Sequence, residues 1–374
     1  MKKYLVIDNQ GEREMNKEEY VDLLFENLSN HFYENIETAY KRVKTYSTFK
    51  HYGNYYSKRP KLVGNCQMSG CLEQPIYSHS ISKRAVLENI ASNGFVYTPV
   101  IKKETIVMDS VGIEKQASVF PCLCNFHDTK FFSELDKTEG RDYSEKFFEQ
   151  LIHRTIFREF YVLERNIEMA NIVLSEIDKS FNEIKSNTID NFNKAFGSER
   201  FTVKDWKDSR FSLPENRKEI EDQINFDKAC LYRLSNFYSI QKPNRITVAI
   251  LDSTLPVAFS GLTKFYLNKR QINMVINCLP YKDHTVFAIA NSSEDDKYVK
   301  QELLSKYDLD NMDSLLKLIE VLAVYGTDNV FFDISYWDCL DIDITNKYIQ
   351  EFSNFEGTDP RNQIDFSFLK WDYK

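Results

Sequence analysis

Two closely spaced pairs of metal-binding side chains place the strongest constraint on how this chain can fold. Cys66 and Cys71 enclose four residues, and Cys124 and His127 enclose two. The second spacing brings both side chains to one ion at the first turn of a helix, and a Cys3His set is a common closed tetrahedral zinc site. Gly70 stands where a tight turn within the first pair needs an unrestricted backbone. The sequence therefore predicts that these two segments meet at a structural Zn²⁺ ion.

Two alternatives stay open for this cluster. Cys122 competes with Cys124, because it stands five residues before His127, the separation that also joins Cys66 to Cys71. The other alternative is a chance grouping of buried thiols. The sequence shows no secretory leader and no apolar run long enough to span a membrane, so we expect a cytoplasmic protein with no membrane partner. Because cytoplasmic thiols stay reduced, clustered cysteines indicate metal binding rather than disulfides.

Charge is unevenly distributed along the chain. The whole sequence carries a net charge of −8, but residues 41–103 contain eleven basic and two acidic residues, a net charge of +9. A basic block in an acidic protein indicates a polyanion-binding region, and aromatic residues between its first cations can stack on bases. A solvated helix face above packed tyrosines would give the same pattern. The candidate nucleic-acid contacts are Lys41, Arg42, Lys44, Lys58, Arg59 and Lys83.

Hydrophobic periodicity predicts an α+β fold. Apolar residues recur at helical spacing over 14–45 and, without Gly or Pro, over 142–195. Further helices are expected at Ser82–Ala91, Tyr298–Tyr307 and Met312–Tyr325, and strands at Gly94–Ile101, Thr105–Met108, Ile246–Leu251, Met274–Cys278, Thr285–Ala290 and Val330–Ile334. The sequence contains no Walker loop, G-x-G-x-x-G or G-x-S-x-G motif, which argues against a P-loop enzyme, a dinucleotide-binding enzyme and a serine hydrolase.

These patterns predict four consecutive parts. They are a helical, basic and aromatic leader (1–60), a zinc-binding module (61–135), a long central helical segment (136–200) and a C-terminal mixed α+β domain (201–374). The central helices are also candidates for joining copies of the chain into a homo-oligomer.

The zinc-binding module resembles the HNH, or ββα-metal, nucleases. A cysteine pair with a glycine turn precedes a short strand that ends at His79, within SHSISK. A second strand then leads to a helix that opens with C-x2-H and continues with Asp128. The resemblance covers about residues 63–133. The motifs S-H-x-I-S-K and C-x2-H-D are also similar to those of uncharacterised bacterial proteins associated with phage-defence genes.

The resemblance implies a treble-clef fold around the zinc ion. In that family the His that ends the first strand is the general base that activates water, which here is His79. The residue after the last zinc ligand binds a divalent cation, which here makes Asp128 the ligand of a catalytic Mg²⁺ or Mn²⁺ ion beside the scissile phosphate.

The chemistry of phosphodiester hydrolysis calls for the same groups. A general base with a pKa near neutrality is most readily a His, and a carboxylate is a suitable ligand for a hard cation. We therefore expect a metal-dependent HNH-like endonuclease that cuts DNA or RNA, with a role in antiviral defence. The alternative is a zinc-stabilised module that binds nucleic acid or protein without cutting. In that case His79 is a fourth zinc ligand or a buried structural side chain, and Asp128 caps the start of its helix.

Overall fold

A computed structural model of the 374-residue chain confirms an α+β fold. It describes residues 4–8, 11–15, 65–68, 70–102, 105–135, 143–196, 215–240, 245–268, 270–353 and 359–370. Five of the candidate nucleic-acid contacts, Lys41, Arg42, Lys44, Lys58 and Arg59, lie outside the described residues. So does the helix expected over 14–45, apart from residues 14 and 15, which belong to a strand.

The chain divides into two compact units. The smaller contains residues 1–47 and 166–228, and the larger contains residues 48–165 and 229–374. Two long helices contribute to both units, namely α4 (Glu145–Phe196), in the segment predicted to be helical, and α6 (Glu215–Ile240). Among the described helices, none is long and apolar enough to cross a membrane.

In the smaller unit, β1 (Tyr4–Asp8) and β2 (Gly11–Met15) form an antiparallel hairpin. The same unit contains the later part of α4 and the first part of α6, whose apolar side chains pack together. The residues in this contact are Ile167, Ala170, Leu174, Ile220 and Ile224.

An antiparallel sheet of seven strands organises the larger unit. Its strand order is β5-β4-β11-β8-β9-β10-β7. The strands are β4 (Phe95–Lys102), β5 (Thr105–Gly112), β7 (Arg245–Leu251), β8 (Val257–Leu267), β9 (Arg270–Pro280), β10 (Thr285–Asn291) and β11 (Val330–Phe332). Because β4 pairs with β11, the expected zinc-binding segment and the expected C-terminal domain share one sheet.

Helices cover both faces of this sheet. On one face, α8 (Met312–Tyr325) packs against side chains that include Ile276 of β9. On the other, the first part of α4 packs against Val275, the neighbouring residue of the same strand. Successive side chains of a strand point to opposite faces, so a strand covered on both sides is buried along its length. All seven residues of β10 are buried accordingly.

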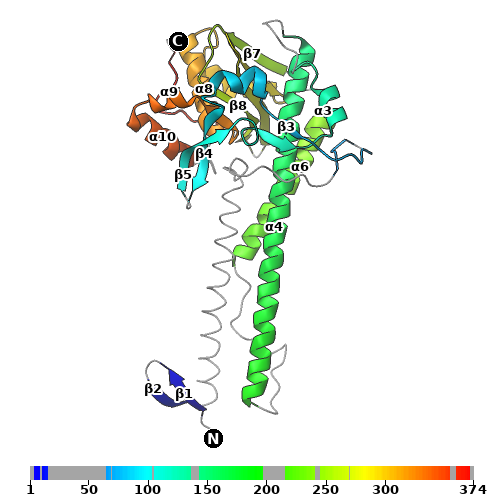
Figure 1. Cartoon of the computed structure of the whole chain (residues 1–374), viewed down its shortest axis with the longest axis vertical. Helices are drawn as coiled ribbons and strands as arrows, with labels where there is room; N and C mark the ends of the chain where they lie inside the picture. The colour runs from blue at the N-terminus through cyan, green and yellow to red at the C-terminus, as the bar shows by residue number, and fades with distance from the viewer. Residues whose placement is uncertain are drawn as a thin grey trace. The chain divides into compact units, whose positions relative to one another are not determined.

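The remaining helices complete the larger unit. They are the π-helical turn η1 (Lys83–Leu87), α2 (Glu88–Ile90), α3 (Asn125–Phe131), α7 (Asp296–Glu302), the 3-10 turn η2 (Leu304–Lys306), α9 (Ile334–Asp338) and α10 (Ile342–Ser353). Figure 1 shows α9 and α10 beside β4 and β5. The strand expected over Val330–Ile334 ends at Phe332, because the side chain of Asp333 accepts a hydrogen bond from the backbone N–H of Tyr336 and starts α9.

Two buried carboxylate clusters stabilise the larger unit. Arg158 of α4 pairs with Glu159 at 2.6 Å and with Asp328 at 2.8 Å. Burial raises the pKa of both carboxyl groups, and the Arg158 charge opposes that rise. In α8, the buried Glu320 accepts hydrogen bonds from the Ser367 hydroxyl and from the backbone N–H groups of the next two residues. This second cluster fixes the C-terminal segment to α8.

Candidate metal centre and the histidine beside it

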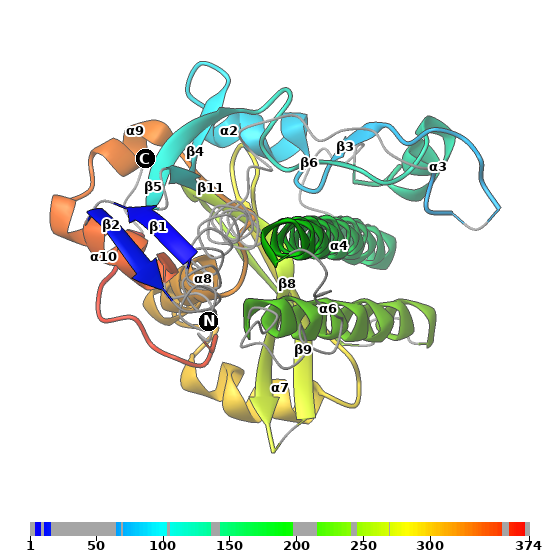
Figure 2. The ribbon, with the colours of Figure 1, turned by 90° about the horizontal axis from the view of Figure 1, so that it is seen from below.

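A small strand–strand–helix arrangement carries the candidate site. The strand β3 (Tyr77–His79) pairs antiparallel with β6 (Val119–Pro121), and α3 follows β6 after a short turn. Figure 2 shows β3, β6 and α3 next to one another, with the first turns of α4 beside them. The expected helical insertion at Ser82–Ala91 is present as η1 and α2, and β4 and β5 lie in the same insertion between β3 and β6.

A tight turn shapes the first cysteine pair. The N–H of Cys66 donates to the carbonyl of Glu73 at 2.8 Å, and the N–H of Cys71 donates to the carbonyl of Met68 at 2.9 Å. Gly70 has a φ of 78°, a backbone conformation that favours glycine. The unrestricted backbone predicted at this position is therefore used in the turn.

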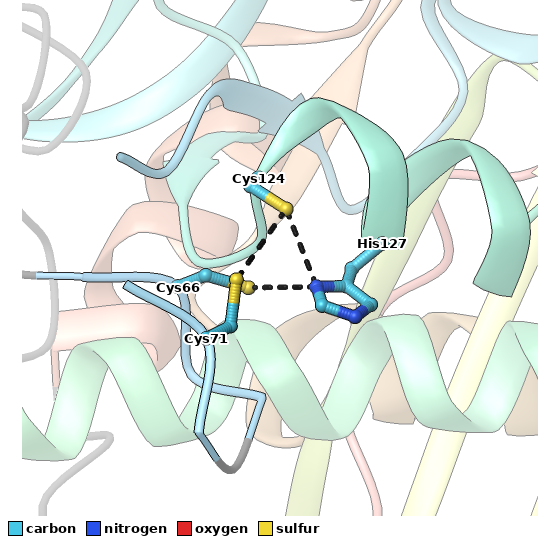
Figure 3. A group of neighbouring side chains, drawn as sticks. All are labelled: Cys66, Cys71, Cys124 and His127. Carbon is cyan, nitrogen blue, oxygen red and sulfur yellow. Dashed lines mark hydrogen bonds between the residues drawn. The ribbon is translucent and has the colours of Figure 1, made fainter. Parts of the chain in front are cut away.

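The two pairs meet, as predicted, in one cluster. The sulfur atoms of Cys66, Cys71 and Cys124 and one ring nitrogen of His127 all lie within 4.8 Å of one another. His127 Nδ1 is 3.2 Å from Cys124 Sγ and 3.4 Å from Cys66 Sγ, and the Cys71 and Cys124 sulfurs are 3.9 Å apart (Figure 3).

These separations suit a tetrahedral metal ion. Zinc bonds of about 2.3 Å to sulfur and 2.0–2.1 Å to nitrogen place tetrahedral ligands about 3.8 Å apart for two sulfurs and about 3.6 Å apart for sulfur and nitrogen. The observed contacts match both values to within a few tenths of an ångström. The cluster can therefore hold a metal ion such as zinc.

The cysteine that joins His127 in the cluster is Cys124 rather than Cys122. Cys124 stands at the N-terminus of α3, where the backbone N–H of His127 lowers the pKa of its thiol and favours the thiolate that binds metal. Cys122 lies outside the cluster and its thiol donates to Gln67 Oε1 at 2.8 Å. Burial raises the pKa of Cys122 well above its ordinary value, which keeps this thiol protonated.

His79 lies at the end of β3 and is not a member of the cluster. Its Nε2 is 2.9 Å from the carbonyl oxygen of Ile113. A carbonyl can only accept, so Nε2 carries the proton and Nδ1 of the neutral ring has the lone pair. Burial lowers the pKa of His79, the hydrogen bond to the Ile113 carbonyl opposes this change, and the positive charges of Arg154 and Lys83 lower the pKa further. The side chain is therefore neutral near pH 7, with Nδ1 as a proton acceptor.

Asp128 lies in the first turn of α3, where the helix dipole favours a carboxylate, although the N-cap residue itself is Cys124. The Asp128 carboxylate accepts a hydrogen bond from the hydroxyl of Ser78. Ser78 and His79 are successive residues of β3, so their side chains leave the strand on opposite faces. Asp128 thus contacts the strand that carries His79, on the face that Ser78 occupies.

Lys83 is the one candidate nucleic-acid contact among the described residues. Its Nζ is 2.7 Å from a carboxylate oxygen of Glu114 and 4.0 Å from one of Glu88. This lysine is therefore engaged with two acidic side chains, and their charge offsets its own.

Comparisons with known proteins give no relatives. No protein-family model matches the chain, and no curated protein or solved structure matches it.

Three contributors to this site had no separate signal in the sequence. They are Ser78, which holds Asp128, Ile113, which fixes the His79 tautomer, and Arg154, which acts on His79 from α4. Only Ser78 stands next to a predicted site residue in the sequence. Ile113 and Arg154 are distant from the predicted site residues in the sequence, and the fold brings them to the site.

Proposed function

We propose that this chain is a metal-dependent nuclease of the HNH type, which hydrolyses phosphodiester bonds of DNA or RNA. The observation that carries the proposal is the hydrogen bond from His79 Nε2 to the Ile113 carbonyl. This bond leaves Nδ1 of a neutral imidazole as the acceptor, which is the state that a general base needs to take a proton from water.

The surroundings of His79 support the same assignment. Its strand, the paired strand β6 and the helix α3 follow one another in the order expected of a ββα-metal module, and the Cys3His cluster joins the turn before β3 to the start of α3. We propose that this cluster holds a structural Zn²⁺ ion within a treble-clef fold. The ion would fix α3 to the turn before β3 and so support the small two-stranded sheet of β3 and β6.

Asp128 and Ser78 offer oxygen ligands, which Mg²⁺ and Mn²⁺ prefer. We propose that Asp128 holds such a cation, which would neutralise charge on the scissile phosphate. In this proposal His79 removes a proton from the attacking water, and Asp128, which contacts β3 on the face of Ser78, would act on the phosphate through the cation that it holds. A role in phage defence is proposed from the motif resemblance alone.

Cleavage assays with paired histidine variants test the nuclease proposal. Purified protein with Mg²⁺ or Mn²⁺ is offered plasmid DNA, single-stranded DNA and RNA, beside His79→Ala and His153→Ala. His153 is a suitable control because it is also a partly buried histidine with a pKa lowered by burial, but it lies on α4. Wild type and His153→Ala should cut one substrate class, and His79→Ala should not. If wild type and His79→Ala are equally inert on every substrate, the proposal fails.

A second candidate function is a non-catalytic binding module. The strand geometry favours it, because the side chains of Ser78 and His79 leave β3 on opposite faces while Asp128 contacts Ser78. A module of this kind would bind nucleic acid or a protein partner and retain that binding in His79→Ala. Gel-shift measurements beside the cleavage assay separate the two functions, since binding without cleavage by the wild type supports only this one.

A further inference from the structure

The strand that carries His79 has little support of its own. It is three residues long and pairs only with the equally short β6 within the described residues. Two-stranded sheets are marginally stable, and a base must be held within a fraction of an ångström to act. Something outside β3 and β6 must therefore fix the end of the strand.

Ser80, the residue after His79, lies in a buried hydrogen-bond network. Its side chain is 1% exposed, its hydroxyl is 2.8 Å from the Ser118 hydroxyl, and its N–H donates to the Ser118 carbonyl at 2.9 Å. The N–H of Ile81 donates to the Ser118 hydroxyl at 2.6 Å. Ser118 has a φ of 63°, a strained conformation for a residue with a side chain, and these bonds hold it there.

A side chain from the far end of the sequence completes this network. Asn329 is fully buried, and its side-chain amide donates to the Ser80 hydroxyl at 2.9 Å and to the Ser260 carbonyl at 2.8 Å. The backbone carbonyl of Asn329 accepts a hydrogen bond from the N–H of Ser260, and the backbone N–H of Asn329 donates to Thr327 Oγ1 at 3.1 Å. Asn329 is thus attached to β8 in the middle of the large sheet.

We infer that Asn329 is the positioning residue for His79. It joins the end of β3, through Ser80, to the seven-stranded sheet, while the Ile113 carbonyl accepts a hydrogen bond from the His79 ring. Ser80 directly follows the strand, so its bond to Asn329 holds the chain next to His79. The catalytic part of this inference rests on the proposed nuclease function.

The experiment observes the His79 ring by NMR, so its result does not depend on whether the protein cuts nucleic acid. In ¹⁵N-histidine-labelled full-length protein, NMR reports the tautomer of each histidine in wild type, Asn329→Ala and Ser80→Ala. Both variants should mix the two tautomers of His79, because its ring is no longer held against the Ile113 carbonyl. The control Asn291→Ala removes an equally buried asparagine, 2% exposed, whose amide donates to Ser292. This control should leave the His79 signals unchanged.

Cleavage is then measured on the same proteins. If wild type cuts nucleic acid, Asn329→Ala and Ser80→Ala should lower kcat by about 100-fold, with KM much less affected. If wild type does not cut, the proposed function fails, but the NMR comparison still decides the positioning role. Ser80→Ala decides it if Asn329→Ala does not fold. Unchanged His79 signals in a folded Ser80→Ala protein, or the same mixing of tautomers in Asn291→Ala, would overturn the inference.

Discussion

We expect the proposed Zn²⁺ ion to be lost from Cys124→Ser and retained by Cys122→Ser. The two cysteines are two positions apart and both buried, but only Cys124 Sγ lies within the 4.8 Å cluster. X-ray absorption on the zinc-loaded wild type should give three sulfur ligands at about 2.3 Å and one nitrogen at 2.0–2.1 Å. Metal analysis should find one ion per chain in wild type and in Cys122→Ser, and none in Cys124→Ser.

The energetic effect of this substitution can be worked from the linkage between metal binding and folding. An ion present at a thousand times its dissociation constant stabilises the folded state by about 4 kcal/mol, and Cys124→Ser should lose that amount. The loss should be local, because the apolar cluster around α8 and β9 contains none of the four ligands. Hydrogen exchange should therefore accelerate in β3, β6 and α3 and stay slow in α8. Retention of one zinc ion by Cys124→Ser, or its loss from Cys122→Ser, would refute the reasoning.

Three further substitutions test the electrostatics of the larger unit. Arg154→Met should raise the pKa of His79, measured by NMR titration, because the arginine charge lowers it. Glu320→Ala should destabilise the protein by about 2–6 kcal/mol in urea unfolding, because two backbone N–H groups lose their buried acceptor, without loss of metal. Arg158→Met should cost about 3–5 kcal/mol, since it leaves two buried carboxyl groups without their cation. That loss should grow as pH rises from 5 to 8, because Arg158 lowers the pKa of both carboxyl groups in the folded wild type. Its removal raises these folded-state pKa values further, while the unfolded state ionises as before.

Elements with local signals at both ends could be predicted from the sequence. The helix expected at Met312–Tyr325 has those bounds in the structure, because the Asn311 side chain accepts from the N–H of Ser314 at its start and Gly326 follows its end. The strand β8 was not predicted. Gly261 interrupts its apolar run, and glycine weakens a strand by propensity. In the fold a Cβ at this position would lie 2.1 Å from Thr327 Oγ1, so the close approach of another segment explains the glycine.

The candidate site likewise contains residues that could be predicted from the sequence and contacts that could not. The four residues of the Cys3His cluster could be predicted because each pair is local, and the chemistry of a metal ion dictates the spacing. The contacts that orient His79 could not, because Ile113 and Asn329 are far from it in the sequence and neither residue type indicates the role. Sequence patterns record periodicity and ligand spacing, but a hydrogen bond between distant segments leaves no local pattern.

The net charge counted over a stretch of sequence also differs from the charge that the folded residues present. Residues 41–103 count as +9, but Lys83 pairs with Glu114 and Lys102 pairs with Asp109 at 2.8 Å, and both acidic partners lie beyond residue 103. An ion pair presents little net charge to a phosphate, so these two lysines add little to the attraction of a nucleic acid. Residues 41–61 contain seven basic residues and no acidic one. Most of the positive excess of residues 41–103 therefore lies in residues 41–61, and if the chain binds nucleic acid we expect this segment to contribute to the salt dependence of binding.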